Sequence, residues 1–463
     1  MSTTEKPATT STEQTQTEVP AAATSGDEGA KAGPTEVAWD ALQHLHAHDP
    51  WVNVQLAKAR LARYMHPTMC SRGRPVPGTQ LEVWYKCDHL RQTGSYKERG
   101  ALNALLQLTP EEAQRGVIAA SAGNHAQALA RWGKAVGVPV TVVMPHVAPI
   151  TKVENCKFLG AEVVLAGRNF GEAKADAEKR CRERGMVYIN GYDHPAVIAG
   201  AGTCGLEILD QLPDVDAIIV PVGGGGLIAG IALAVKRLNP RVKVIGVESE
   251  RCPSMCNALR AGKPVFTNVG AGGTIADGLS VSVVGANAFK LVREFVDEVI
   301  TTTEASISLA ILHLLETEKL LVEGAGCAGL AAIMSGRFDH SLRGKKVCTI
   351  LCGGNIDMTV LGRVIEKGLY SSGRMLQFDC AISDRVGGLA HFMNCLALTG
   401  ASVKNIMQEH PFISDMGVVA VHLTVETMNA AHARQVVKQM DEQGFKLKLA
   451  DDKKYSDVNL SRL

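Results

Sequence analysis

The sequence predicts an α/β protein with a doubly wound, mostly parallel sheet, and three observations support this. Strand-like and helix-like segments alternate from about residue 81 to residue 351. The strand segments 216–222 and 242–248 are short apolar runs, as expected for parallel strands buried on both faces. Loops rich in Gly, Ser and Asn follow two of the strands, at the sheet edge where open α/β folds bind ligands.

The expected elements can be assigned in chain order. Helical periodicity covers 39–63, and strands are expected at 81–86, 116–120, 140–144, 162–165, 216–222, 242–248 and 346–351. Further helices are expected from Ser95 through Leu106 and at 125–132, 152–158, 170–184 and 227–238. From about residue 374 the order becomes strand 375–382, helix 387–398, strands 402–408 and 418–424, helix 430–443 and strand 446–449. That βαββαβ order is the ferredoxin-like motif.

Composition separates the chain into four parts. Residues 1–36 contain no aromatic residue and no arginine, so this segment is expected to be a disordered tail. Residues 37–372 form the main α/β region, 374–450 form a separate C-terminal domain, and 451–463 form a short tail. The first segment has no apolar core for a signal peptide, and its acids outnumber its two lysines, unlike a mitochondrial presequence. We therefore expect a cytoplasmic protein.

Charge and cysteine usage exclude several classes of function. The 463 residues carry a formal net charge of +1, which gives no electrostatic case for nucleic acid or an anionic membrane. No apolar run is long enough to span a bilayer. The 12 cysteines form no Cys-x-x-Cys pair and lack histidines at zinc spacing, so we expect reduced, mostly buried thiols and no metal site.

Lys97 is the first candidate catalytic residue. A polar turn, 92–95, leads into a helix in which Ser95 is the expected N-cap and Glu98 completes a capping box. Lys97 then lies in the first helical turn, where the helix dipole disfavours a cation and lowers the amine pKa. A free amine suits Schiff-base chemistry with a carbonyl compound. The alternative is an ordinary solvated lysine.

Two loops are candidate binding sites for anions. Ser121 to Gln127 follows an expected strand and places a hydroxyl, an amide and backbone N–H groups at a helix start. Such a loop can bind a carboxylate, and the alternative is an ordinary helix cap. Gly223, Gly224, Gly225 and Gly226 follow the strand at 216–222. Their backbone N–H groups can converge on a phosphate, and four glycines are costly to order in a mere flexible turn.

The glycine loop also supports an alternative function. Gly224-x-Gly226-x-x-Ala229 matches the dinucleotide-binding fingerprint, and Glu248 ends the next strand about twenty residues on. An NAD(P)-dependent oxidoreductase and a non-catalytic amino-acid sensor therefore remain alternatives at this point. The oxidoreductase leaves Lys97 and the Ser121 loop without a role.

Four motifs in order resemble the pyridoxal-phosphate-dependent serine/threonine dehydratases. They are Lys86-x-Asp-x-x-x-Gln-Thr-Gly-Ser-Tyr-Lys97-x-Arg-Gly-Ala, Ser121-Ala-Gly-Asn-His-Ala-Gln127, Val222-Gly-Gly-Gly-Gly-Leu227 and Leu351-Cys-Gly-Gly-Asn-Ile356. The resemblance covers about residues 45–370. It implies the tryptophan-synthase-β-like fold (fold type II of pyridoxal-phosphate enzymes), a small amino-acid substrate and a dehydratase that releases a 2-oxo acid and ammonia. A racemase of the same fold is the nearest alternative, but racemases of this kind carry a serine where this chain has Ala122.

The resemblance also assigns roles to individual residues. It implies that Lys97 bonds covalently to the cofactor and acts as the base, that Asn124 hydrogen-bonds the phenolic oxygen of the cofactor, and that Gly223 to Gly226 hold its phosphate. Cys352 is expected opposite the pyridine nitrogen. Ser121, Asn124 and His125 are expected around the substrate carboxylate.

The C-terminal domain resembles ACT regulatory domains. Asp384-Arg-Val-Gly-Gly-Leu-Ala390 is similar to the first loop and helix of such domains, although Val386 replaces the usual proline. The resemblance implies an amino-acid effector near Asp384, Gly387 and Leu389, and a homo-oligomer, either dimer or tetramer. The alternative is a purely structural dimerisation module.

Overall fold

The computed structural model describes residues 49–269, 273–409 and 417–450. The tails expected at 1–36 and 451–463, and the first part of the helix expected at 39–63, lie outside the described residues. The remainder of that helix is α2 (Pro50–Leu61), which is capped by the Asp49 side chain.

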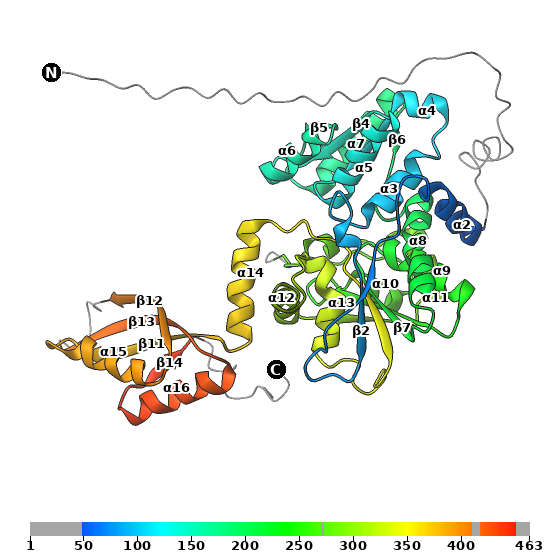
Figure 1. The fold of residues 1–463 in the computed structure, drawn as a ribbon. Coiled ribbons are helices and arrows are strands. Elements are labelled where there is room, and N and C mark those ends of the chain that lie inside the picture. The colour runs from blue at the N-terminus through cyan, green and yellow to red at the C-terminus, as the bar shows by residue number, and fades with distance from the viewer. Residues whose placement is uncertain (1–48, 270–272, 410–416, 451–463) are drawn as a thin grey trace, which may run out of the picture. The chain divides into compact units, whose positions relative to one another are not determined.

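A six-stranded sheet forms the centre of the larger α/β subdomain (Figure 1). Its order is β1-β2-β10-β7-β8-β9, and all neighbouring strands except β1 and β2 are parallel. The bounds are β1 (Cys70–Arg72), β2 (Glu82–Lys86), β7 (Ala217–Pro221), β8 (Lys243–Ser249), β9 (Glu298–Thr302) and β10 (Lys346–Ile350). The central strands are buried on both faces, which explains why they are continuous apolar runs in the sequence.

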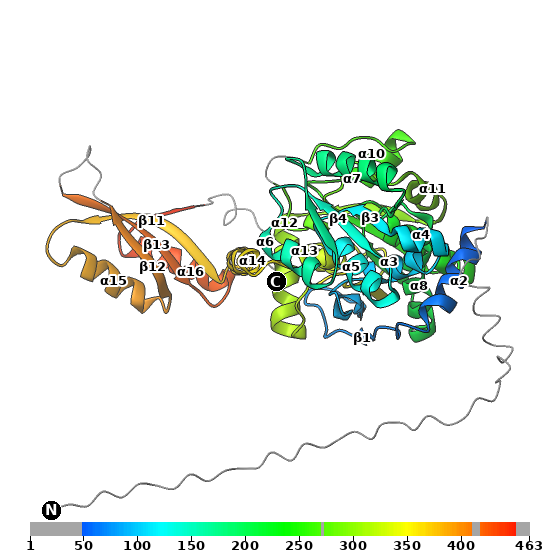
Figure 2. The same cartoon turned by 90° about the horizontal axis from the view of Figure 1, so that it is seen from above.

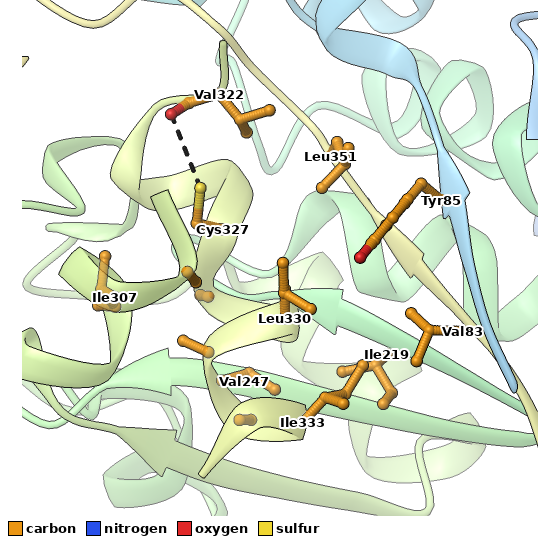
Figure 3. Close-up of a cluster of buried hydrophobic side chains, with 14 of the residues drawn as sticks. Val83, Tyr85, Ile219, Val247, Ile307, Val322, Cys327, Leu330, Ile333 and Leu351 are labelled. Atoms are coloured by element: carbon orange, nitrogen blue, oxygen red, sulfur yellow. Dashed lines mark hydrogen bonds between the residues drawn. The ribbon is translucent and has the colours of Figure 1, made fainter. Parts of the chain in front are cut away.

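Helices cover both faces of this sheet, because successive side chains of a strand point to opposite faces. Ile218 and Val220 of β7 pack with one group of helices: α8 (Pro195–Gln211), α9 (Gly226–Leu238), α10 (Ser254–Ala261) and α11 (Ala286–Phe295). Ile219 packs with the other group: α12 (Glu304–His313), α13 (Gly324–Met334) and α14 (Met358–Ser371). Figure 3 shows part of this second core, including the Cys327 thiol, which donates to the Val322 carbonyl at 3.7 Å.

A second, four-stranded parallel sheet forms the centre of the smaller α/β subdomain. Its order is β5-β4-β3-β6. The bounds are β3 (Val117–Ala120), β4 (Val140–Met144), β5 (Glu162–Leu165) and β6 (Val187–Tyr188). The flanking helices are α3 (Lys97–Leu105), α4 (Pro110–Arg115), α5 (Asn124–Val136), α6 (Ile150–Phe158) and α7 (Phe170–Arg184) (Figure 2). Short helical turns η1 (Asp88–Leu90), η2 (Asp277–Leu279) and η3 (Leu314–Glu318) lie in the connections.

The C-terminal elements run β11 (Met375–Ser383), α15 (Gly388–Leu398), β12 (Ser402–Glu409), β13 (Val418–Glu426), α16 (Ala430–Glu442) and β14 (Leu447–Leu449). The strands form an antiparallel sheet in the order β12-β13-β11-β14. Alternate residues of β11 and β13 are buried with residues of α15 and α16 in a core of their own. The βαββαβ order expected from the sequence is therefore present.

The expected start of α3 is wrong. The helix begins at Lys97, and Ser95 instead forms an isolated antiparallel bridge with Gly353. The Ser95 hydroxyl makes no hydrogen bond with any described residue, while Glu98 accepts from the Thr93 backbone N–H and from the Trp132 indole. Tertiary partners thus replace the capping box that the local sequence favours.

Candidate active site

A cavity of about 510 Å³ lies where loops of the two parallel sheets meet. The loops after β3 and β7 contribute to it, as the rule for open α/β sheets predicts. Every candidate catalytic, cofactor-binding and substrate-binding residue expected from the sequence lines this one cavity: Lys97, Ser121, Asn124, His125, Gly223, Gly224, Gly225, Gly226 and Cys352.

Lys97 is the first residue of α3 and points its amine at the cavity. Its Nζ donates to the Gly191 carbonyl and lies 5.0 Å from the centroid of the Tyr96 ring. Removal from water lowers the pKa of Lys97 to about 8, although the nearby Cys352 and Glu323 raise it. The helix start adds to the same effect, so a reactive neutral amine is accessible near neutral pH.

A buried ion cluster of Lys86, Asp88, Arg99 and Glu207 anchors α3. The Arg99 guanidinium donates to both Asp88 oxygens at 2.7 and 2.8 Å and to both Glu207 oxygens at 2.5 and 2.7 Å. Lys86 contacts Glu207 at 2.6 Å. Burial opposes ionisation of Asp88, but Arg99 holds the pKa of that carboxyl well below its usual range. Through Arg99, two residues after Lys97, the cluster connects α3 to η1, β2 and α8.

The start of α5 presents the polar groups of the Ser121 loop. Its first residue is Asn124, and helix geometry leaves the first backbone N–H groups without helical partners. The Ser121 hydroxyl accepts from the Gly123 N–H at 3.3 Å. These backbone donors suit a carboxylate.

The His125 side chain is less suited to the expected carboxylate contact. Burial lowers the pKa of His125 to about 3, with help from the Lys97 charge, so the ring is neutral. Its Nε2 lies 3.0 Å from the Ile189 carbonyl, which can only accept, so Nε2 carries the proton. The remaining Nδ1 is then an acceptor and cannot donate to a carboxylate. Any contact from His125 to an anion therefore comes from its backbone N–H.

The glycine loop needs its glycines for packing as well as for access. Gly225 has φ +94°, a left-handed conformation that favours glycine, and α9 begins at Gly226. A Cβ on Gly224 would lie 2.3 Å from the Tyr192 ring, and one on Gly226 would lie 2.3 Å from the Tyr192 carbonyl oxygen. The loop therefore presents bare backbone at the start of a 13-residue helix, which suits a phosphate.

Glu323 lines the cavity and was not singled out from the sequence, and Asn355 lies in the fourth motif but was given no role there. The Glu323 carboxylate accepts from Asn124 Nδ2 at 2.7 Å, and Asn355 Nδ2 donates to Asn124 Oδ1 at 2.8 Å. A usable sequence signal exists for the first, because Glu323 is the one charged residue between Lys319 and Arg337. Such a carboxylate in an apolar, small-residue stretch is typical of a functional position.

The structure argues against the dinucleotide alternative. Glu248 is buried at the end of β8, and its two oxygens accept from the backbone N–H groups of Met255 and Cys256 at 2.6 and 2.9 Å. The carboxylate caps α10 and is not available to a ribose. The second element of the NAD(P) fingerprint is therefore structural, and the oxidoreductase expectation is not supported.

The three candidate effector residues lie together at the turn from β11 to α15. Gly387 precedes α15 with φ +89°, and the neighbouring Gly388 is required because a Cβ there would lie 2.1 Å from the Ser383 carbonyl oxygen. Leu389 is 37% exposed. Asp384 donates its backbone N–H to the Gly417 carbonyl at 3.0 Å.

Other expectations concern the whole chain. All twelve cysteines are free thiols, nine of them buried. Within 49–269, 273–409 and 417–450, no helix is both long and apolar enough to cross a bilayer. The same ranges contain no group of three or more His, Cys, Asp or Glu residues placed to hold a metal ion.

Comparison with known proteins agrees with this geometry. Residues 67–353 match the family model described as "Pyridoxal-phosphate dependent enzyme". The chain belongs to this family of pyridoxal-phosphate-dependent enzymes. It is 41% identical over 369 residues to the L-threonine ammonia-lyase of Thermotoga maritima, covering 80% of this chain and 91% of that protein.

Two solved structures of the family are similar as well. The processed form of threonine deaminase isoform 2 from Solanum lycopersicum has a TM-score of 0.65 and 32% identity, over 70% of this chain and 95% of that one. Maize serine racemase has a TM-score of 0.63 and 34% identity, over 69% and 98% of the two chains. The α/β fold is therefore that of fold-type-II pyridoxal-phosphate enzymes.

The cavity fits the cofactor of this family on the residues described. It holds one low-pKa lysine amine, a glycine backbone at a helix start, and an asparagine amide on the opposite loop. Burial raises the pKa of the Cys352 thiol well above its usual range, so the thiol at the cavity wall is neutral.

Proposed function

We propose that this protein is a pyridoxal-phosphate-dependent ammonia-lyase that eliminates water from L-threonine, L-serine or both. The products are a 2-oxo acid (2-oxobutanoate or pyruvate) and ammonia. The observation that carries the proposal is the Lys97 amine, held at reduced pKa in a cavity that also contains the glycine loop and Asn124. The similarity to a bacterial L-threonine ammonia-lyase over 91% of its length supports the same reaction.

The roles of the residues follow from their chemistry. Lys97 would hold the cofactor covalently, and its free amine would be the base that takes the α-proton. The backbone of Gly223 to Gly226 binds the cofactor phosphate, and Asn124 donates to the oxygen of the cofactor ring. When bound, the cofactor withdraws electrons from the α-carbon, which makes that proton acidic.

The substrate carboxylate is assigned to the start of α5. Ser121 and the backbone N–H groups of Asn124 and His125 are its proposed donors, because the His125 ring has none to offer there. The neutral Cys352 thiol suits elimination, since it need not protonate the ring nitrogen fully. In this proposal Lys97 transfers the proton, and the start of α5 orients the substrate.

The test is an assay of the purified full-length protein on L-threonine and L-serine. We expect 2-oxo acid and ammonia in equal amounts, a yellow protein, and a borohydride-trapped cofactor on the peptide containing Lys97. Lys97→Ala should lose both turnover and the trapped adduct, while Lys58→Ala, at an exposed site on α2, should lose neither. A trapped adduct on another lysine would show that the assignment of Lys97 is wrong.

The same assay separates the lyase from a racemase. The similarity to maize serine racemase makes D-serine formation the alternative to measure. Ala122 packs against the core of the smaller α/β subdomain, and its methyl side chain has no proton to deliver to the α-carbon. We therefore expect little D-serine from L-serine, and substantial D-serine would favour the racemase.

We also propose that residues 37–372 are the catalytic region and that residues 374–450 form an ACT-like regulatory domain. A small amino acid is the proposed effector, bound near Asp384, Gly387 and Leu389 between two chains of a homo-oligomer. Calorimetry with isoleucine, valine, threonine and serine, on the full chain and on a chain ending at Gly373, tests this. The truncated chain should keep its colour and turnover but lose any effector-dependent shift of typically about 5–150-fold in affinity. Unchanged kinetics and no binding outside the catalytic site would indicate a structural domain.

A further inference from the structure

Glu323 is a buried carboxylate at the cavity for which the proposed chemistry has no role. It is 6% exposed and immediately precedes α13. Its side chain does not cap that helix, although a carboxylate there could accept the free N–H groups of the first turn. The side chain instead turns to Asn124, whose Nδ2 donates to Glu323 Oε1 at 2.7 Å.

The backbone around Glu323 is shaped to permit this contact. The Glu323 N–H donates to the Gly353 carbonyl at 3.0 Å, which brings the loop after β10 against the carboxylate. A Cβ at Gly353 would lie 2.1 Å from Glu323 Oε1 and 3.0 Å from Asn124 Nδ2. Only glycine at this position leaves room for the Glu323–Asn124 hydrogen bond.

The other side of the Asn124 amide is held as firmly. Asn355 Nδ2 donates to Asn124 Oδ1 at 2.8 Å and to the Thr93 carbonyl at 2.6 Å. The Asn355 loop is also bound to the segment before Lys97, because Gly354 donates to Gly94 at 2.9 Å and Tyr96 donates to Cys352 at 3.0 Å. The hydrogen-bond series Glu323–Asn124–Asn355–Thr93 thus connects the start of α13 to the turn before α3.

The two ends of this series decide how both amides are oriented. The Thr93 carbonyl can only accept, so Asn355 must turn its nitrogen toward Thr93. The Glu323 carboxylate, when ionised, also only accepts, so Asn124 must turn its nitrogen toward Glu323. With its oxygen and one N–H engaged, Asn124 has one N–H left for a ligand in the cavity.

We propose that Glu323 is a positioning residue for the cofactor, which holds the Asn124 amide in the single orientation that leaves an N–H for the oxygen of the cofactor ring. This inference rests on the proposed function, in which Asn124 donates to that oxygen. Glu323 itself does not touch the cofactor in this role. Burial, together with the Asp277 charge, raises the pKa of Glu323 to about 7, although the hydrogen bond from Asn124 acts in the opposite direction.

The experiment is a double-mutant cycle on the full-length protein, stripped of cofactor and titrated with pyridoxal phosphate. The variants are Glu323→Ala, Asn124→Ala and the double variant, and the readouts are the dissociation constant and the absorption maximum of the lysine-bound cofactor. Losing a hydrogen bond to a charged group is expected to weaken binding by about 10-fold or more. Because Glu323 acts through Asn124, the double variant should bind no worse than Asn124→Ala alone.

Controls separate positioning from general damage. Glu304→Gln alters another buried glutamate, in the first turn of α12, whose partners Ser249, Thr274 and Ile275 do not line the cavity. It should leave the absorption maximum unchanged even if it lowers the melting temperature. If Glu323→Ala does not fold, Glu323→Gln enters the same cycle, since its amide can present either an oxygen or an N–H to Asn124.

The outcomes are distinct. Additive effects of Glu323→Ala and Asn124→Ala, with normal cofactor binding in the wild type, overturn the positioning role alone. An unchanged absorption maximum and affinity in Glu323→Ala do the same. A wild-type protein that forms no lysine-bound cofactor overturns both this inference and the proposed function.

Discussion

The reduced pKa of Lys97 makes a quantitative prediction about the cofactor-free protein. With a pKa of about 8, the Lys97 amine is about 9% neutral at pH 7, compared with about 0.03% for a lysine at the ordinary value of 10.5. The neutral amine is the nucleophile, and at pH 7 its fraction at Lys97 should be roughly 300-fold larger than at an ordinary lysine. The structural cause is burial in the cavity wall, with the helix start acting in the same direction.

Competitive labelling measures this pKa directly. The cofactor-free protein is treated with trace acetic anhydride at a series of pH values, and mass spectrometry gives the acetylated fraction of each lysine peptide. Lys97 should reach half-maximal labelling near pH 8, and the exposed Lys58 serves as the internal reference for reagent activity. Glu323→Gln should move the Lys97 midpoint to lower pH, because the Glu323 charge raises the pKa of Lys97. A Lys97 midpoint at pH 10 or above would refute the reasoning from burial.

Three further predictions concern stability and titration. Asp88→Asn removes a counter-charge from the buried cations of the ion cluster and should lower the free energy of unfolding, measured in urea, by about 3–5 kcal/mol. The control Asp210→Asn breaks an exposed ion pair and should lower it by less than about 1 kcal/mol. Similar losses in the two variants would mean that the cluster does not stabilise α3. Gly200→Ala places a Cβ 2.4 Å from the backbone of α3 and should lower the free energy of unfolding by about 1–3 kcal/mol. The control Gly362→Ala, in open space on α14, should raise it by about 0.5–1 kcal/mol. A change of the same sign in both variants would contradict the packing argument. The His422 ring is hydrogen-bonded to a carboxylate on each side, so its pKa should lie above 6.5 when titrated by NMR. Any stability that the charged ring contributes is therefore present at low pH and is lost as pH rises through this raised pKa. A titration midpoint below pH 6.5 would show that these contacts do not form in solution.

The sequence predicts the cavity better than it predicts the details within it. The α5 start and the glycine loop are recognisable because each combines a rare local composition with a position at the end of a strand, and Lys97 is recognisable as a cation in the first turn of a helix. The reason for the glycines is only partly visible, since the contact of Gly224 with the Tyr192 ring depends on tertiary packing. A Gly224→Asp variant would therefore clash with Tyr192 whether or not the loop binds phosphate, and would not test that role.

The errors have a common physical origin. The capping box at Ser95 and Glu98 is a local pattern, and it fails because Glu98 finds the Trp132 indole, a partner 34 residues away, instead of the start of its own helix. Glu323 was not recognised, and Asn355 was given no role within its motif, because both act through hydrogen bonds to Asn124, more than 190 residues away in each case. Sequence rules describe local propensity and helix caps, whereas the roles of these residues depend on contacts between distant segments that form only when the chain folds.

The strand order of the large sheet has a consequence for how this protein is made. Val83 of β2 pairs with Val347 of β10, about 260 residues later in the chain, and the smaller sheet is encoded between them. At a synthesis rate of roughly 5–20 residues per second, β2 waits on the order of 13–50 s for its neighbour to leave the ribosome. During that interval all four strands of the smaller sheet are synthesised, while the inner edge of β2 exposes unpaired backbone groups that can pair with other chains. The nascent protein is therefore most vulnerable to aggregation in the period between the emergence of β2 and that of β10, and holding that edge apart is a task for chaperones.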